Sequence, residues 1–72
     1  MNWYAFDEQI QVGVEENSGG FSAKRIHLFV PGHAGFLEPS PQLRGRYFRS
    51  NADAATAAVD ELRARHPKIF AQ

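Results

Sequence analysis

The sequence predicts an α+β fold with the element order β-β-β-α, in which one C-terminal α-helix packs on one face of a three-stranded antiparallel β-sheet. The first half of the chain alternates between apolar and polar residues with a period of two, which is typical of half-buried strands. Asn, Ser and Gly residues that favour turns separate these segments. An alanine-rich segment with the spacing of an amphipathic helix follows near the C-terminus.

The first predicted strand covers residues 3–15. Asp7 and Glu8 interrupt its alternation, because Glu8 falls on the apolar side, and we therefore expect a bulge or a bend at this point. One side of the extended chain carries its apolar residues, which are Tyr4, Phe6, Ile10, Val12 and Val14.

The second predicted strand covers residues 21–30 and follows a turn over residues 16–20. Ile26, Leu28 and Val30 share one side of this strand. We expect an antiparallel hairpin in which these three side chains are buried together with the apolar side of the first strand. The other side of the second strand carries Ala23, Arg25, His27 and Phe29.

The segment 31–42 is predicted to be a loop, because it contains three prolines and two glycines. Two arrangements fit this composition. The segment forms either a mobile flap or a wrapped loop that Phe36 and Leu37 fix to the body of the domain.

A third strand is predicted over residues 43–49, directly before the helix. Leu43 and Tyr47 are expected to face the helix, because the arginines on the other side of this strand resist burial. Phe48 lies on the arginine side, and it either tucks under the start of the helix or is exposed.

The predicted helix covers residues 51–66. Ser50 and Asp53 have the spacing of a capping box, with Asn51 as an alternative N-cap. Pro67 is expected to end the helix, because proline disfavours helical geometry at the residue before it and donates no backbone hydrogen bond.

The helix has one apolar face of small side chains, with the spacing i, i+3, i+4 and i+7. Small side chains allow a helix to lie close to a flat sheet. Glu61 and Arg65 form an i,i+4 pair in the favourable order on the helix surface. The apolar face consists of Ala55, Ala58, Val59 and Leu62.

Length and composition limit the class of protein. The 72 residues form one domain, residues 1–72, with a thin core. Eight acidic and eight basic residues give a formal net charge of zero, although residues 39–72 hold six of the bases and three of the acids. No apolar run approaches the ~20 residues that span a bilayer, and the N-terminus has no basic region before an apolar segment. We therefore expect no membrane association and a cytoplasmic location.

The sequence offers little for catalysis or cofactor binding. It has no cysteine, and the spacing of His27, His33 and His66 matches no standard zinc site. No nucleophile elbow or phosphate-binding loop is present. A chain this short also leaves little room for a pocket of the usual ~300 Å³ or more. We expect a protein that is not an enzyme and that has no metal, cofactor or small-molecule substrate.

The sheet face that the single helix leaves uncovered is the main functional candidate. It would present Trp3 and Phe29, and the tail residues Ile69 and Phe70 also need apolar partners. An exposed apolar patch of this kind marks a protein-interaction surface. The sequence thus predicts a protein-interaction module or a homodimer that uses these four residues.

A nucleic-acid-binding module is the alternative. Residues 43–49 interleave arginines with aromatic residues, which can contact phosphates and stack on bases. The opposing interpretation is that residues 43–49 form an edge strand, whose arginines prevent edge-to-edge pairing with another chain. The candidate contacts are Lys24, Arg25, Arg44, Arg46 and Arg49.

A short motif at the end of the predicted sheet carries a resemblance to known families. Residues 48–54 read Phe-Arg-Ser-Asn-Ala-Asp-Ala, which matches the pattern F-x-[ST]-x-x-[DE]-A. Over residues 46–65 the chain resembles small bacterial β-β-β-α proteins of uncharacterised families. It is more distantly similar to the arm-type DNA-binding domain of phage integrases, where a three-stranded sheet precedes such a helix. The first resemblance implies a fold, and the second implies DNA binding.

Overall fold

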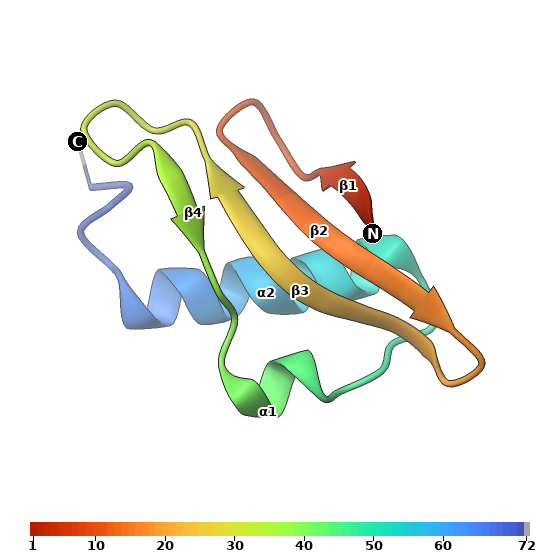
Figure 1. The fold of residues 1–72 in the computed structure, drawn as a ribbon. Helices are drawn as coiled ribbons and strands as arrows, with labels where there is room; N and C mark the ends of the chain where they lie inside the picture. Colours follow the sequence, from red (N-terminus) through yellow and green to blue (C-terminus); the bar gives the residue numbers. More distant parts are fainter. Residues whose placement is uncertain (72) are drawn as a thin grey trace.

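The computed structural model describes residues 1–71, which form an antiparallel sheet of four strands and two helices. The strands lie in the order β1-β2-β3-β4 (Figure 1). The predicted α+β class, with an antiparallel sheet and a C-terminal helix, is confirmed, but the sheet has four strands instead of three. The elements are β1 (Asn2–Ala5), β2 (Ile10–Asn17), β3 (Gly20–Leu28), β4 (Gly35–Leu37), α1 (Pro41–Arg44) and α2 (Asn51–Arg65).

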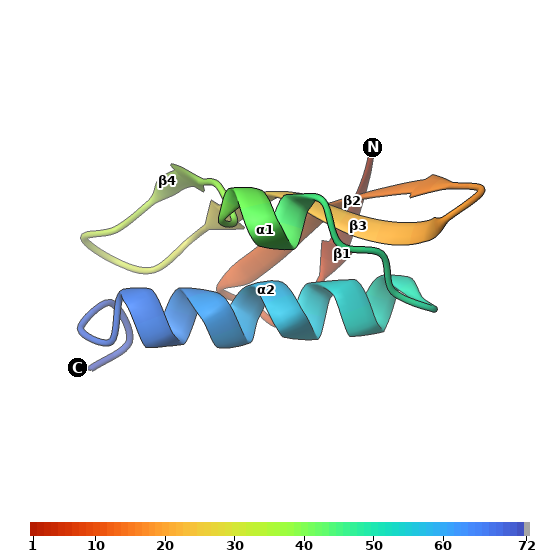
Figure 2. The same cartoon turned by 90° about the horizontal axis from the view of Figure 1, so that it is seen from below.

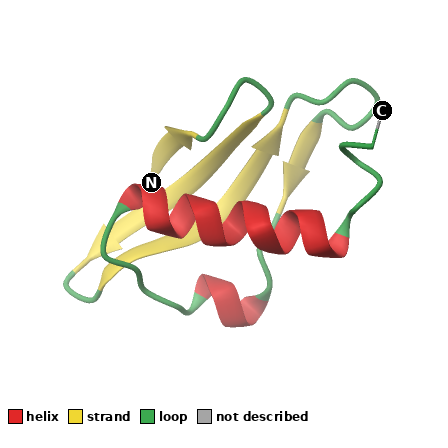
Figure 3. Ribbon diagram, turned by 180° about the vertical axis from the view of Figure 1, so that it is seen from behind, coloured by secondary structure: helices red, strands yellow, loops and turns green. Residues whose placement is uncertain are grey.

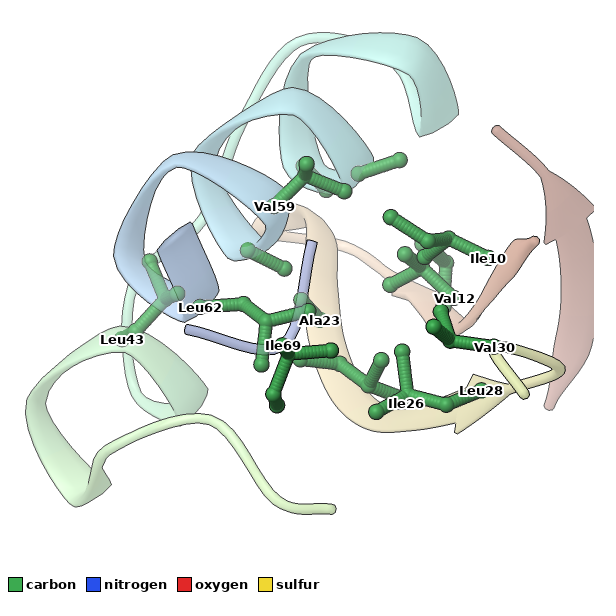
Figure 4. Packing of buried hydrophobic residues seen from close by; sticks show 14 residues of the cluster. Ile10, Val12, Ala23, Ile26, Leu28, Val30, Leu43, Val59, Leu62 and Ile69 are labelled. Carbon is green, nitrogen blue, oxygen red and sulfur yellow. The ribbon is translucent and has the colours of Figure 1, made fainter. Parts of the chain in front are cut away.

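The long helix α2 covers one face of the sheet, so that the molecule has two layers (Figures 2 and 3). Figure 4 shows side chains of the sheet and of α2 meeting in a single apolar core. The predicted apolar face of α2 and the predicted burial of both central strands are confirmed. The buried hydrophobic residues are Ile10, Val12, Val14, Ala23, Ile26, Leu28, Val30, Leu43, Ala54, Ala55, Ala58, Val59, Leu62 and Ile69.

The first predicted strand is two strands joined by a tight turn. The Asp7 carboxylate accepts a hydrogen bond from the backbone N–H of Gln9 at 2.8 Å, and the N–H of Phe6 donates to the Ile10 carbonyl at 3.0 Å. The chain therefore reverses at the acidic pair, where the sequence predicted a bulge or a bend. Tyr4 pairs with Val12 in this arrangement.

The central hairpin β2–β3 is antiparallel as predicted, but it contains a bulge. Gly13 pairs with Arg25, whereas Val14 pairs with Ala23, so Lys24 is an extra residue in β3. The bulge moves Ala23 to the helix side of the sheet, where it is fully buried. The simple alternation of the sequence placed Ala23 on the uncovered face, which is wrong for this reason.

The segment between β3 and α2 differs most from the prediction. Its first part contains β4, which pairs with β3, and its second part contains α1. The third strand predicted over residues 43–49 is not formed; Phe48 makes a single bridge to Phe21, with N···O distances of 2.9 and 2.7 Å. Leu43 is buried as predicted, but from a helix. Tyr47 is not buried against α2 but remains exposed, and its hydroxyl accepts a hydrogen bond from the Asn17 side chain.

Ser40 joins the two helices. Its hydroxyl oxygen accepts a hydrogen bond from the Leu43 N–H and caps α1. The same hydroxyl donates to Glu61 Oε2 at 2.5 Å, and the Ser40 N–H donates to Glu61 Oε1 at 2.7 Å. Arg65 lies 3.7 Å from the same carboxylate, which confirms the predicted pair. Burial raises the pKa of Glu61, but the hydrogen bonds from Ser40 and the Arg65 charge outweigh burial, so the pKa lies below its ordinary value.

The ends of α2 follow the predicted signals. The Ser50 hydroxyl accepts a hydrogen bond from the Asp53 N–H at 3.0 Å, so Ser50 is the N-cap. The helix ends at Arg65 with His66 as the C-cap, directly before Pro67. Among the described residues, no helix is long and apolar enough to cross a membrane.

Candidate interaction surface

The sheet face opposite α2 carries four aromatic side chains that lie together. Two of them come from neighbouring strands: His27 on β3 pairs with Phe36 on the edge strand β4. Trp3 lies on β1 and Phe29 directly follows β3. We call Trp3, His27, Phe29 and Phe36 the outer aromatic cluster.

The rings of the cluster contact one another. His27 stacks on Phe36 with the ring centroids 4.2 Å apart and an interplanar angle of 20°. Phe29 lies against His27 at 4.1 Å, and Trp3 approaches His27 edge-on at 6.0 Å and Phe36 at 6.1 Å. The faces of the His27 and Phe36 rings are therefore turned largely toward each other.

Two further side chains border the outer aromatic cluster. The Arg25 guanidinium lies 4.3 Å from the centre of the Phe36 ring, which is a cation–π contact. Met1 lies over Gly13, because a Cβ atom at Gly13 would come within 2.6 Å of the Met1 sulfur. The absence of a side chain at Gly13 thus allows Met1 to extend the apolar surface across β2.

This surface is open to solvent. Trp3, Phe29 and Phe36 expose 42%, 45% and 50% of their areas, and Met1 exposes 58%. Tyr47 is the other large hydrophobic residue with comparable exposure in residues 1–71, and it lies outside the cluster. Most of the exposed large apolar side chains are therefore gathered on one face of the sheet.

Two of the four residues predicted for the protein-interaction face lie in this cluster. Trp3 and Phe29 both contact His27 on the uncovered face. Ile69 does not lie there, because it is buried in the core on the α2 side. Phe70 packs half-buried against the same core, with Arg63 5.7 Å from its ring centre. The segment after α2 folds back on the molecule and gives both tail residues their apolar partners.

The strand predicted to carry Arg44, Arg46 and Arg49 is not formed, so these residues do not line up beside Lys24 and Arg25. The Lys24 ammonium donates to the Arg44 carbonyl at 2.7 Å at the end of α1. Arg44 lies in α1, 3.5 Å from Glu38, and Arg46 lies over the Phe48 ring at 4.8 Å. Arg49 is exposed in the segment before α2. Within this set, Arg25 is the residue that borders the outer aromatic cluster.

The sequence placed His27 on the uncovered face without assigning it a role, and it left Phe36 in a loop. The sequence does contain a weak sign that Phe36 lies on a strand. In Gly35-Phe36-Leu37, two consecutive apolar residues would point to opposite faces of a short strand. Three residues are too few to show a periodic pattern.

An open groove lies beside the β4 edge of the sheet, between β4 and the segment after α2. Its volume of about 560 Å³ is larger than we expected for so short a chain. We call this hollow the C-terminal groove. Residues 1–71 contain no cluster of three or more His, Cys, Asp or Glu side chains that could hold a metal ion.

Comparison of the chain with protein-family models, with curated proteins and with solved structures finds no match. Both resemblances drawn from the sequence therefore stay predictions.

Proposed function

We propose that this chain is a small non-enzymatic protein-interaction module that forms a homodimer through its outer aromatic cluster. The observation that carries the proposal is the gathering of exposed Trp3, Phe29, Phe36 and Met1 on one face of the sheet. A contiguous exposed apolar surface on a small domain marks an interaction site.

A second copy of the same chain is the partner that fits this surface most simply. A two-fold interface brings the same patch of both copies together, so the patch must be complementary to itself. Apolar rings meet this condition, whereas a patch of one charge repels its own copy. Association would also add burial to a chain whose own core is thin.

The geometry favours protein over nucleic acid as the partner. Base stacking needs aromatic faces that are open to the ligand, but His27 and Phe36 are stacked on each other. Nucleic-acid binding also depends chiefly on phosphate neutralisation. Lys24 and Arg44 are held at α1, which leaves Arg25 as the basic side chain against the cluster.

Sedimentation equilibrium over a wide concentration range tests this proposal. Wild-type protein is expected to show a reversible monomer–dimer equilibrium, and the double substitution Trp3→Ala, Phe29→Ala is expected to weaken it by at least about tenfold, because central aromatic residues dominate interface energies. Tyr47→Ala is the matched control, since Tyr47 is as exposed as Phe29 but lies outside the cluster. A wild-type protein that stays monomeric at millimolar concentration would contradict the proposal.

A further inference from the structure

The C-terminal groove combines an apolar floor with a basic rim. Leu28 at the end of β3 and Ile69 after α2 line it and are buried, so they form its floor. Leu37 of β4 is half-buried and adds to the same apolar surface. Figures 1 and 3 show the segment after α2 beside β4 and the loop before it.

The rim of the groove is basic on both sides. His33, from the loop before β4, lies on one side, and Arg65, His66 and Lys68, from the end of α2 and the following segment, lie on the other. All four side chains are exposed. Within residues 1–71, no Asp or Glu lines the groove. The formal positive charges of the rim are those of Arg65, which also pairs with Glu61, and Lys68, and His33 and His66 add imidazole hydrogen-bonding groups.

The helix dipole explains only part of this arrangement of basic side chains. Basic residues in the last turn of a helix are favourable because the C-terminal end carries a partial negative charge, and Arg65 fits that role. His33 does not, because it belongs to a different segment and faces the groove from the opposite side. Lys68 lies beyond the C-cap His66 in a turn closed by the Ile69 N–H to the His66 carbonyl at 3.2 Å.

We infer that the C-terminal groove binds a small organic acid with an apolar body, such as a medium-chain fatty acid. The carboxylate would lie among the basic side chains of the rim, where charge-assisted hydrogen bonds are strongest. The hydrocarbon chain would lie on Leu28, Leu37 and Ile69. A volume of about 560 Å³ lies within the range of ordinary small-molecule sites. This inference goes beyond the homodimer proposed above, because Phe36 is the one residue that the groove shares with the outer aromatic cluster among residues 1–71.

An NMR titration of ¹⁵N-labelled protein with octanoate tests this inference. We expect saturable shifts of the backbone amides of residues 33–35, 65, 66, 68 and 69, with little change at Trp3 and His27. Phe36 borders both the groove and the outer aromatic cluster, so its amide is left out of the comparison. Octanol, which lacks the charge, and acetate, which lacks the apolar body, should each bind at least about tenfold more weakly.

The double substitution His33→Gln, Lys68→Gln removes basic groups from both sides of the groove without touching the core, because both residues are exposed. It should weaken octanoate binding by about tenfold. Arg49→Gln is the matched control, since it removes an exposed positive charge far from the groove and should leave the affinity within about twofold. An unchanged spectrum confirms that each variant is folded.

Three kinds of result would overturn the inference, and they concern the location of the shifts, the dependence on charge and the class of ligand. The first is an absence of saturable shifts in the groove, or shifts confined to the outer aromatic cluster. The second is equal binding of octanoate and octanol, or an affinity that the double substitution leaves unchanged. The third is a short peptide that shifts the same amides at much lower concentration than octanoate, which would assign the groove to a protein C-terminus.

Discussion

Gly20 is the residue at which the backbone geometry leaves least freedom. It has a φ of +121° and follows the turn of the central hairpin. A Cβ atom built on it would lie 2.5 Å from the Phe48 carbonyl oxygen. That carbonyl accepts the Phe21 N–H in the bridge that ties the segment before α2 to the sheet. Both the conformation and the contact therefore require glycine.

Replacing Gly20 by Ala is expected to destabilise the protein by about 2 kcal/mol or more, because it adds backbone strain and pushes the Phe48 backbone away. Chemical denaturation measures this change in the free energy of unfolding. Gly32→Ala is the comparison, since Gly32 also has a positive φ, of 83°, but no atom lies within 4 Å of its built Cβ. A loss at Gly20 no larger than the loss at Gly32 would show that the close approach costs nothing.

Glu61 links the two helices through its side chain. Its carboxylate accepts two hydrogen bonds from Ser40 and holds α1 against α2. Because these bonds favour the charged form, the pKa of Glu61 is lower in the folded chain than its ordinary value of 4.5. A depressed pKa contributes stability above the ordinary value, and that contribution is lost as the pH falls through the folded value.

Glu61→Gln is expected to lower the free energy of unfolding by about 1 kcal/mol at pH 7, because a charged acceptor is replaced by a neutral one. The difference from wild type should stay constant between pH 6 and pH 8 and shrink below about pH 4.5. Urea denaturation across this pH range measures it. If the difference were the same at pH 3 and pH 7, ionised Glu61 would not be the source of the stability.

At the scale of elements, α2 is the most predictable part of the chain. Its alanine-rich sequence, its apolar face and its cap act within the helix itself, so they can be identified without knowledge of the fold. The Ser50 hydroxyl caps the first turn, and the adjacent Asn51 lies within the helix. The sequence left both residues open as the N-cap.

Ser50→Ala should therefore destabilise the protein by about 1 kcal/mol, because the Asp53 N–H loses its hydrogen-bond partner. Asn51→Ala is expected to change stability by less than half of that amount. Thermal unfolding followed by circular dichroism measures both variants under the same conditions. Equal losses in the two variants would mean that the two side chains share the role of N-cap.

The elements that sequence reasoning missed are short or depend on partners distant in the chain. β4 has three residues and α1 has four, so neither is long enough to repeat a recognisable apolar pattern. The bulge at Lys24 reverses the alternation of β3 and buries Ala23, although nothing in the local sequence marks it. The alternation of residues along the strands was enough to place Trp3 and Phe29 on the uncovered face. The position of Phe36, in contrast, depends on how β4 pairs with β3.

At the scale of the whole molecule, the two faces of the sheet differ in their environment. One face packs against α2 and is buried, and the other carries the outer aromatic cluster and is exposed. A domain of this size buries only about 60% of its unfolded surface, so a second layer on the exposed face would add substantially to its stability. In Figure 2, no helix of the described residues lies over this face of the sheet.

The most direct test of the proposed homodimer is an isotope-filtered NOE experiment on an equal mixture of labelled and unlabelled protein. We predict intermolecular NOEs between the rings of Trp3, Phe29 and Phe36 of the two copies, with concentration-dependent shifts confined to the same face. Single-stranded DNA added at low salt should leave these signals unchanged. Intermolecular NOEs from another surface, or DNA-dependent shifts at Trp3 and Arg25 that fade as salt rises, would contradict the account.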